Sequence, residues 1–281
     1  MNINFTLIAL ASAFFAAIAN ILARSLLKAN LKAKDMLAIN FLTMAAILIL
    51  FSPTFYYFHA TGQAIFLVLI VSIIDTLANF FYFKTFEKTE ASIATPILSL
   101  APGFTFMLGW LLLSDVVSIQ SYLMCIVIII LIIIFSADLK DFKKFRTATL
   151  IPAIIASALF GISAIPAKIL LDTSHAINAP TLYMYRAGII GVFSLLLFRF
   201  PIKEISARQY RFIFVRCLFV IAQWLLLYFA LSRGNAGVTI TLGNVTPIFV
   251  FILGMIFLKE KITVKKIITA SLILVLSLLI R

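Results

Sequence analysis

Two stretches of the sequence decide the fold: residues 91–115 read ASIATPILSLAPGFTFMLGWLLLSD, and residues 236–260 read AGVTITLGNVTPIFVFILGMIFLKE. They lie 145 positions apart and share a Pro-x-Phe-x-Phe motif, which begins at Pro102 and at Pro247. A glycine seven residues after each proline and an acidic residue at the end of each stretch also fall in register. Proline and glycine rarely coincide by accident in apolar sequence, so this agreement indicates an internal repeat.

The same offset aligns a second region without gaps, because the Ala-Ser-Ala of residues 11–13 recurs at residues 156–158. A single spacing that relates two distant regions predicts two halves of similar structure. We place the first half at residues 1–140 and the second at residues 146–281.

The composition identifies the solvent in which this chain folds. Hydrophobic residues make up 64% of its 281 residues and charged residues only 12%, with a mean hydropathy of +1.17. Soluble domains are about half apolar and about a quarter charged, so a soluble globular fold is excluded. The two cysteines lie in apolar runs, which argues against a disulfide scaffold or a Cys-rich metal site. We expect an all-α integral membrane protein without a cofactor or metal.

A helix needs about 20 apolar residues to cross a bilayer, because each residue adds about 1.5 Å to its length. We expect ten transmembrane helices, at residues 3–23, 36–54, 64–83, 91–113, 118–136, 150–171, 178–198, 209–231, 236–258 and 262–280. Each half then holds five helices, and an odd number makes the second half enter the membrane in the opposite sense. The predicted architecture is a pair of inverted repeats around a central cavity.

The basic residues are unevenly distributed, because 18 of the 23 lie in the loops that follow odd-numbered helices. The positive-inside rule places these loops in the cytoplasm and both termini outside, which suits a bacterial inner membrane. The charges are spread over five short loops rather than gathered on one folded face, so nucleic acid is not an expected partner, whereas anionic membrane lipids are. Ten helices can enclose a cavity alone, so we expect a monomer.

Two five-helix halves, each with an Ala…Pro-x-Phe helix followed by a short acidic hairpin, resemble the EamA-type members of the drug/metabolite transporter superfamily. The resemblance covers nearly the whole chain. Tyr185-Arg186-Ala-Gly is similar to the arginine-containing second helix of that repeat, whereas the first half has Asn40-Phe41 at this place. The resemblance implies a transporter whose fourth and ninth helices line a central cavity. It also implies cytoplasmic termini, contrary to the charge distribution.

Asp75 is the one acidic residue near the middle of a predicted span. An ionisable group at that depth costs about 2.5–3.5 kcal/mol on insertion scales, so it is expected to face the bundle interior or a watery cavity. Asn79 and Tyr82 follow four and seven residues later, on the same helix face. We predict that Asp75 couples transport to protons or binds a substrate ammonium group. The alternative is that it only pairs with Arg186 or Arg216 and holds the halves together.

Polar residues share a face with a proline in both the fourth and the ninth predicted helices. A proline inside a span leaves one carbonyl without its usual donor, and such broken helices are tolerated where they line a cavity. We expect the cavity wall to contain Thr95, Ser99, Pro102, Thr241, Asn244 and Pro247. The alternative is that both prolines merely kink packed helices.

Arg186 and Arg216 lie about two turns into the seventh and eighth predicted helices, and Gln223, Trp224 and Tyr228 continue the eighth inward. Arginine offers fixed donors that suit a carboxylate or phosphate, and aromatic rings offer flat apolar surfaces. We predict that one of the two arginines meets an anionic substrate group and that the other three residues belong to the same substrate site. The alternative, chiefly for Arg216, is that the side chain snorkels toward the headgroups.

Together these features predict a secondary transporter that moves a small polar or amphipathic metabolite, such as an amino acid or related zwitterion, by alternating access. The sequence has no G-x-x-x-x-G-K-[ST] loop, so direct ATP drive is not expected. Two alternatives stay open. An integral membrane enzyme acting on a lipid or prenyl substrate would need acid–base groups clustered near one interface, and a structural or receptor protein would need no polar cavity.

Overall fold

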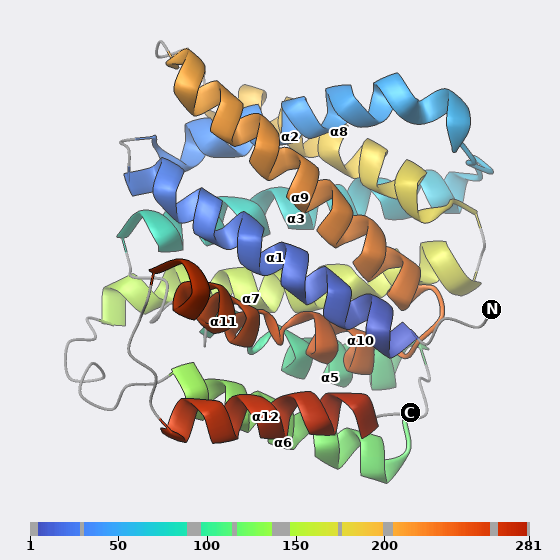
Figure 1. Cartoon of the computed structure of the whole chain (residues 1–281). Helices are drawn as coiled ribbons and strands as arrows, with labels where there is room; N and C mark the ends of the chain where they lie inside the picture. The colour runs from blue at the N-terminus through green and yellow to red at the C-terminus, as the bar shows by residue number, and fades with distance from the viewer. Residues whose placement is uncertain are drawn as a thin grey trace.

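The computed structural model describes residues 5–28, 31–88, 97–113, 117–136, 147–173, 176–198, 205–258 and 264–279. These residues form a helical bundle and contain no strand, only an isolated antiparallel bridge between Phe58 and Ile177 (Figure 1). The helices are α1 (Phe5–Lys28), α2 (Ala33–Phe51), α3 (Gly62–Lys88), α5 (Ala101–Leu113), α6 (Ile119–Ser136), α7 (Thr147–Lys168), α8 (Ala179–Phe198), α9 (Ala207–Leu231), α10 (Ala236–Gly243), α11 (Thr246–Leu258) and α12 (Val264–Leu279). A short 3-10 turn, Ser52–Thr54, follows α2, and a π-helical turn, Ile169–Thr173, follows α7. The prediction of an all-α fold is confirmed.

Seven helical segments among the described residues are long and apolar enough to cross a bilayer: Phe5–Leu27, Ala33–Thr54, Gly62–Glu87, Ile151–Asp172, Ala179–Phe198, Ala207–Leu231 and Ala236–Leu253. Shorter apolar helical segments, Ala101–Leu113, Ile119–Ile134 and Ile268–Leu279, fall within the other three expected spans. Large apolar side chains such as Leu50 and Ile119 are 75% and 73% exposed, whereas Asp75 and Arg186 are fully buried. An apolar exterior around a polar interior suits hydrocarbon as the solvent, and the chain is a multi-pass integral membrane protein.

The helix boundaries recur at the spacing of the sequence repeat. Gly62 begins α3 and Ala207 begins α9, while Ala101 begins α5 and Thr246 begins α11. Both pairs of starting residues are 145 positions apart. The repeat therefore extends from the aligned motifs to the positions at which helices start.

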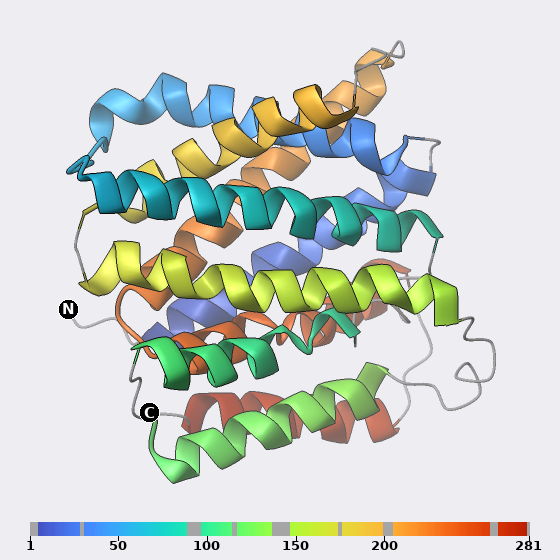
Figure 2. The same cartoon turned by 180° about the vertical axis from the view of Figure 1, so that it is seen from behind.

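Helices from the two halves of the sequence pack on one another in matching pairs. The contact of α1 with α9 corresponds to the contact of α7 with α3, and the contact of α1 with α11 corresponds to that of α7 with α5. At one end of the bundle α2 packs on α8, and at the opposite end α6 packs on α12 (Figure 1). Figure 2 shows α3 and α7 side by side. The long helices α1, α3, α7 and α9 thus form the middle of the molecule.

The predicted fourth and ninth helices are both interrupted. The first ends in a turn at residues 99–100 before α5 begins, and the second is broken between Gly243 and Thr246. Pro102 and Pro247 are each the second residue of the helix that follows the break. A backbone N–H is not needed in the first turn of a helix, so proline fits there and the break precedes it.

The start of α5 is fixed against α7 through Gly161. A Cβ atom on Gly161 would lie 2.5 Å from the carbonyl oxygen of Ala101 and 2.7 Å from the Cβ of Phe104, so glycine permits this close approach. The Thr105 hydroxyl also donates a hydrogen bond of 3.1 Å to the carbonyl oxygen of Gly161. The broken end of α5 is therefore held in one position relative to α7.

Candidate functional site

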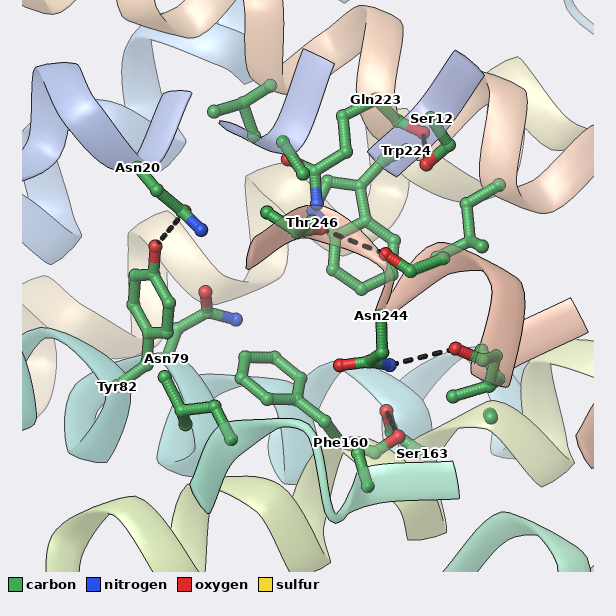
Figure 3. A pocket seen from close by; sticks show the side chains of 18 of the residues that line it. Ser12, Asn20, Asn79, Tyr82, Phe160, Ser163, Gln223, Trp224, Asn244 and Thr246 are labelled. Carbon is green, nitrogen blue, oxygen red and sulfur yellow. Dashed lines mark hydrogen bonds between the residues drawn. The ribbon is translucent and has the colours of Figure 1, made fainter. Parts of the chain in front are cut away.

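A cavity lies inside the bundle where the broken helices of both halves meet (Figure 3). It offers about 150 Å³ to water-sized molecules. Its wall is built by α1, α2, α3, α7, α9, α10 and α11, together with Leu98, Ser99 and the first residue of α5, Ala101. The polar side chains of the lining are Ser12, Asn20, Asn79, Tyr82, Ser99, Ser163, Arg216, Gln223, Asn244 and Thr246, with the aromatic rings of Phe41, Phe83, Phe160, Trp224 and Tyr228.

The cavity brings together part of the predicted site. The predicted residues that line it are Asn79, Tyr82, Ser99, Gln223, Trp224, Tyr228 and Asn244. The predicted residues that do not line it are Asp75, Pro102, Arg186, Thr241 and Pro247. Thr95 lies outside the described residues. Thr241 is buried and donates its hydroxyl to the carbonyl oxygen of Gly237 at 2.8 Å, which is a bond within α10.

Asn244 closes the broken end of α10 at the cavity wall. Its backbone N–H and its Nδ2 both donate to the carbonyl oxygen of Ile240, at 3.0 and 2.8 Å. The Thr246 hydroxyl donates to the carbonyl oxygen of Gly243 at 3.0 Å. These bonds satisfy carbonyls that the end of a helix leaves without a donor. The side-chain oxygen of Asn244 points away from them, into the space beside Phe160 (Figure 3).

Arg216 lies in another part of the cavity wall and is 4% exposed. Its Nη1 donates to the Asn40 side-chain oxygen at 2.6 Å, and its Nε donates to the Ala19 carbonyl oxygen at 3.2 Å. The side chain therefore joins α9 to α2 and α1. The alternative that Arg216 snorkels toward the headgroups is wrong, because its donors are directed into the bundle.

Asn20 and Tyr82 border the cavity near Arg216, since the Tyr82 hydroxyl lies beside the guanidinium group. That hydroxyl donates a hydrogen bond to the Asn20 side-chain oxygen (Figure 3). Asn79 lies on the same side of the cavity as Asn20 and Tyr82, and Asn244 lies on the opposite side (Figure 3). The cavity therefore has polar side chains at both ends.

An ion pair lies behind the aromatic part of the wall, where Arg186 Nε meets Asp75 Oδ2. Neither side chain is more than 1% exposed. The guanidinium carbon of Arg186 lies 3.8 Å from the centroid of the Trp224 ring, with the Tyr183 and Tyr228 rings at 5.6 and 5.8 Å. Arg186 is thus paired with a carboxylate and surrounded by aromatic rings that attract a cation.

Among the polar and aromatic residues of the lining, sequence reasoning missed seven: Ser12, Asn20, Phe41, Phe83, Phe160, Ser163 and Thr246. Ser12 and Asn20 are eight residues apart on one face of an apolar helix, and that spacing was the available signal. The Ser12 hydroxyl donates to the carbonyl oxygen of Gln223 at 2.8 Å, which ties α1 to α9. Phe160 and Ser163 gave no such signal, because Phe160 is the one aromatic residue of α7 and small residues such as Ser163 are common throughout that helix.

The lining offers groups that could bind a solute. It offers amide groups, hydroxyl groups, one guanidinium group and flat rings. Within the described ranges, no three His, Cys, Asp or Glu side chains gather as metal ligands would. The two cysteines are free and buried, and Cys217 donates to the Asn40 carbonyl oxygen at 3.5 Å.

Comparisons with known proteins agree with this architecture. A family model described as the EamA-like transporter family matches residues 5–137 and 147–281. A solved structure titled only "Crystal structure of protein" is similar with a TM-score of 0.77 and 13% sequence identity, over 99% of this chain and 99% of that chain. At that identity the likeness shows the fold alone. No curated protein matches the sequence.

Proposed function

Because the chain belongs to the EamA-like transporter family, we propose that it is a secondary transporter that moves a small polar or amphipathic metabolite by alternating access. The observation that carries the proposal is the cavity, whose wall contains the broken helices of both matched segments. Transporters built from repeats bind solutes between their repeats, where helix breaks provide polar groups inside the membrane. A cavity lined by both matched segments supports the proposal.

The proposed mechanism is rocking of two inverted halves with five spans each, with the basic loops in the cytoplasm of a bacterial cell. The matching contacts support it, because α1 with α9 and α7 with α3 are the same contact with the halves exchanged. Two halves related by a two-fold axis make each contact twice, which gives matching pairs of helix contacts. Rotation of one half against the other would then expose the cavity to each side in turn.

The lining supports an amphipathic solute. Asn20 and Tyr82 border the cavity near Arg216, Asn244 lies across from them, and the Phe160 and Trp224 rings lie between. Small-molecule sites combine apolar walls with a few placed polar groups in this way. Amino acids and related zwitterions are the first class that we propose to test.

We also propose Asp75 as the proton-coupling group. Its backbone carbonyl accepts a bond of 2.8 Å from Asn79, and Ser163 lies beside its carboxylate, so Asp75 lies next to two residues of the cavity wall. A movement that separates Asp75 from Arg186 would leave a buried carboxylate that is more stable when protonated. In Asp75→Asn, the transport rate is expected to lose its dependence on the pH gradient. Unchanged pH dependence and unchanged solute affinity would make Asp75 a packing residue.

The test of transport begins with a thermal-shift screen of metabolites on the purified protein, followed by flux measurements in proteoliposomes. A stabilising metabolite should accumulate with time in proteoliposomes and not in protein-free liposomes. The alternative, an enzyme that acts on a lipid or prenyl substrate, predicts conversion of the compound without accumulation. If no stabilising metabolite crosses the membrane, the proposed function fails.

A further inference from the structure

The described residues include three basic side chains that are buried, and only one of them has no carboxylate partner. Lys168 Nζ lies 2.7 Å from Asp172 Oδ2, and Arg186 pairs with Asp75. Arg216 lines the cavity, and its polar contacts are with the Asn40 amide, the Ala19 carbonyl and the neighbouring Tyr82 hydroxyl, all of them uncharged. The wall of the cavity therefore carries a positive charge that the described part of the chain does not neutralise.

The guanidinium of Arg216 keeps donors for a ligand. A guanidinium group has five N–H donors in a fixed fork; the bonds to Ala19 and Asn40 use two of them, and the Tyr82 hydroxyl lies beside a third. These two bonds also hold the fork in one orientation against α1 and α2. A buried charge without a partner is costly. An anion that enters the cavity would therefore be stabilised both by the positive charge of Arg216 and by hydrogen bonds from its remaining N–H groups.

The helix breaks add to this positive character. The first residue of α5, Ala101, and the first residue of α11, Thr246, both line the cavity. The N-terminus of a helix carries the positive end of its dipole, and half-helices in transporters direct that end at anionic groups. At the opposite, negative end of α10, Asn244 and Thr246 donate to the carbonyl oxygens of Ile240 and Gly243, which reduces the negative character of this end.

No side chain of the described lining would balance an ammonium group by charge. The lining contains no Asp or Glu, and Asp75 lies outside it, paired with Arg186. An amino group would meet only neutral oxygens, such as those of Asn79 and Asn244. The described lining therefore offers an opposite charge to a carboxylate and none to an amino group.

We propose that the transported solute is a small organic carboxylate whose carboxylate binds Arg216 beside Asn20 and Tyr82. Its apolar part lies along α9 toward Trp224, which is eight residues further on and hence about 12 Å away along the helix. This inference rests on the proposed function and names its substrate class. It also requires that a carboxylic acid without an amino group binds at least as well as the corresponding amino acid.

The binding test uses the fluorescence of the cavity tryptophan in the purified full-length protein. The chain has two tryptophans, and Trp110 is 73% exposed, so Trp110→Phe leaves Trp224 as the reporter in the cavity. Hexanoate and 4-phenylbutyrate are titrated against hexanamide, 4-phenylbutanamide and hexylamine. We expect both carboxylates to bind about tenfold more tightly than their amides, and the amine to bind no better than the amides.

Substitution at Arg216 then identifies the group responsible. Arg216→Gln is expected to abolish the preference for carboxylates, and Arg216→Lys to keep part of it, because lysine retains the charge without the fork. The control is Arg233→Gln, since Arg233 is exposed and lies outside the lining. This variant should bind carboxylates in preference to amides to the same extent as the unsubstituted protein. Equal binding of carboxylates and amides, no binding of either carboxylate, or a preference that survives in Arg216→Gln would overturn the inference.

Two further measurements keep the test decisive. If Arg216→Gln does not fold, Arg216→Lys and Tyr82→Phe replace it, and unchanged carboxylate affinity in both would count against the inference. Flux in proteoliposomes separates this inference from the proposed function. If carboxylates bind with an Arg216-dependent preference but are not transported, the proposed function is overturned and the anion site stands. If amines or neutral solutes are transported, the anion site is overturned and the proposed function stands.

Discussion

Arg186 and Arg216 lie on consecutive helices, are both buried within the bundle, and meet opposite surroundings. Arg186 pairs with Asp75 under the Trp224 ring and does not line the cavity. Arg216 lines the cavity and contacts neutral acceptors from α1 and α2. Burial alone therefore does not tell what an intramembrane arginine does. The charge of its partner separates an arginine that stabilises the bundle from one that is available to a ligand.

The largest effect on stability is expected at the Arg186 pair. Asp75→Asn leaves a buried guanidinium group without its carboxylate, so the free energy of unfolding should fall by about 3–5 kcal/mol. Unfolding by SDS in mixed micelles measures this change. The double variant Asp75→Asn with Arg186→Met removes both charges and should recover much of the loss. If the single and double variants have the same free energy of unfolding, the loss of stability is not caused by the unpaired charge of Arg186.

A smaller loss is expected from the ring that covers Arg186. Trp224→Leu removes the aromatic face 3.8 Å from the guanidinium carbon and leaves the Asp75 pair in place, so the loss should be about 2–3 kcal/mol. Trp110→Leu is the matched control, because Trp110 is 73% exposed, and it should change stability by less than about 0.5 kcal/mol. The same unfolding assay compares the two variants. Equal losses would show that the ring contributes nothing specific to Arg186.

The smallest loss is expected at the other arginine. Arg216→Gln removes two hydrogen bonds but leaves no opposite charge unpaired, so stability should fall by about 1–2 kcal/mol. Thermal unfolding of this variant beside Asp75→Asn measures the contrast. A loss at Arg216 as large as that at Asp75 would erase the distinction between the two arginines and make Arg216 a structural residue.

The all-helical membrane fold and the family were predictable because they depend on composition and on comparison of the chain with itself. The positions of the helix breaks were predictable for a similar reason, since Pro102 and Pro247 mark them locally. The partner of Asp75 was not predictable. It depends on how each helix is rotated about its axis when packed, so sequence left both Arg186 and Arg216 open.

The surroundings of Arg216 show the same limit. Its place after a basic loop favoured a side chain directed toward the headgroups, but the acceptor that holds it is Asn40 of a distant helix. Sequence marked Asn40 only as the position where the first half lacks the arginine motif. Such contacts join helices far apart in the chain, and local patterns do not reveal them.

The bond between Arg216 and Asn40 connects the two segments that the family model matches separately. Its length of 2.6 Å leaves little room for sliding before it weakens. If the segments rock, the fork of Arg216 loses its orientation as α2 and α9 separate. A bound anion would then be released by the same displacement that opens the far side, because a ligand favours whichever arrangement it binds more tightly.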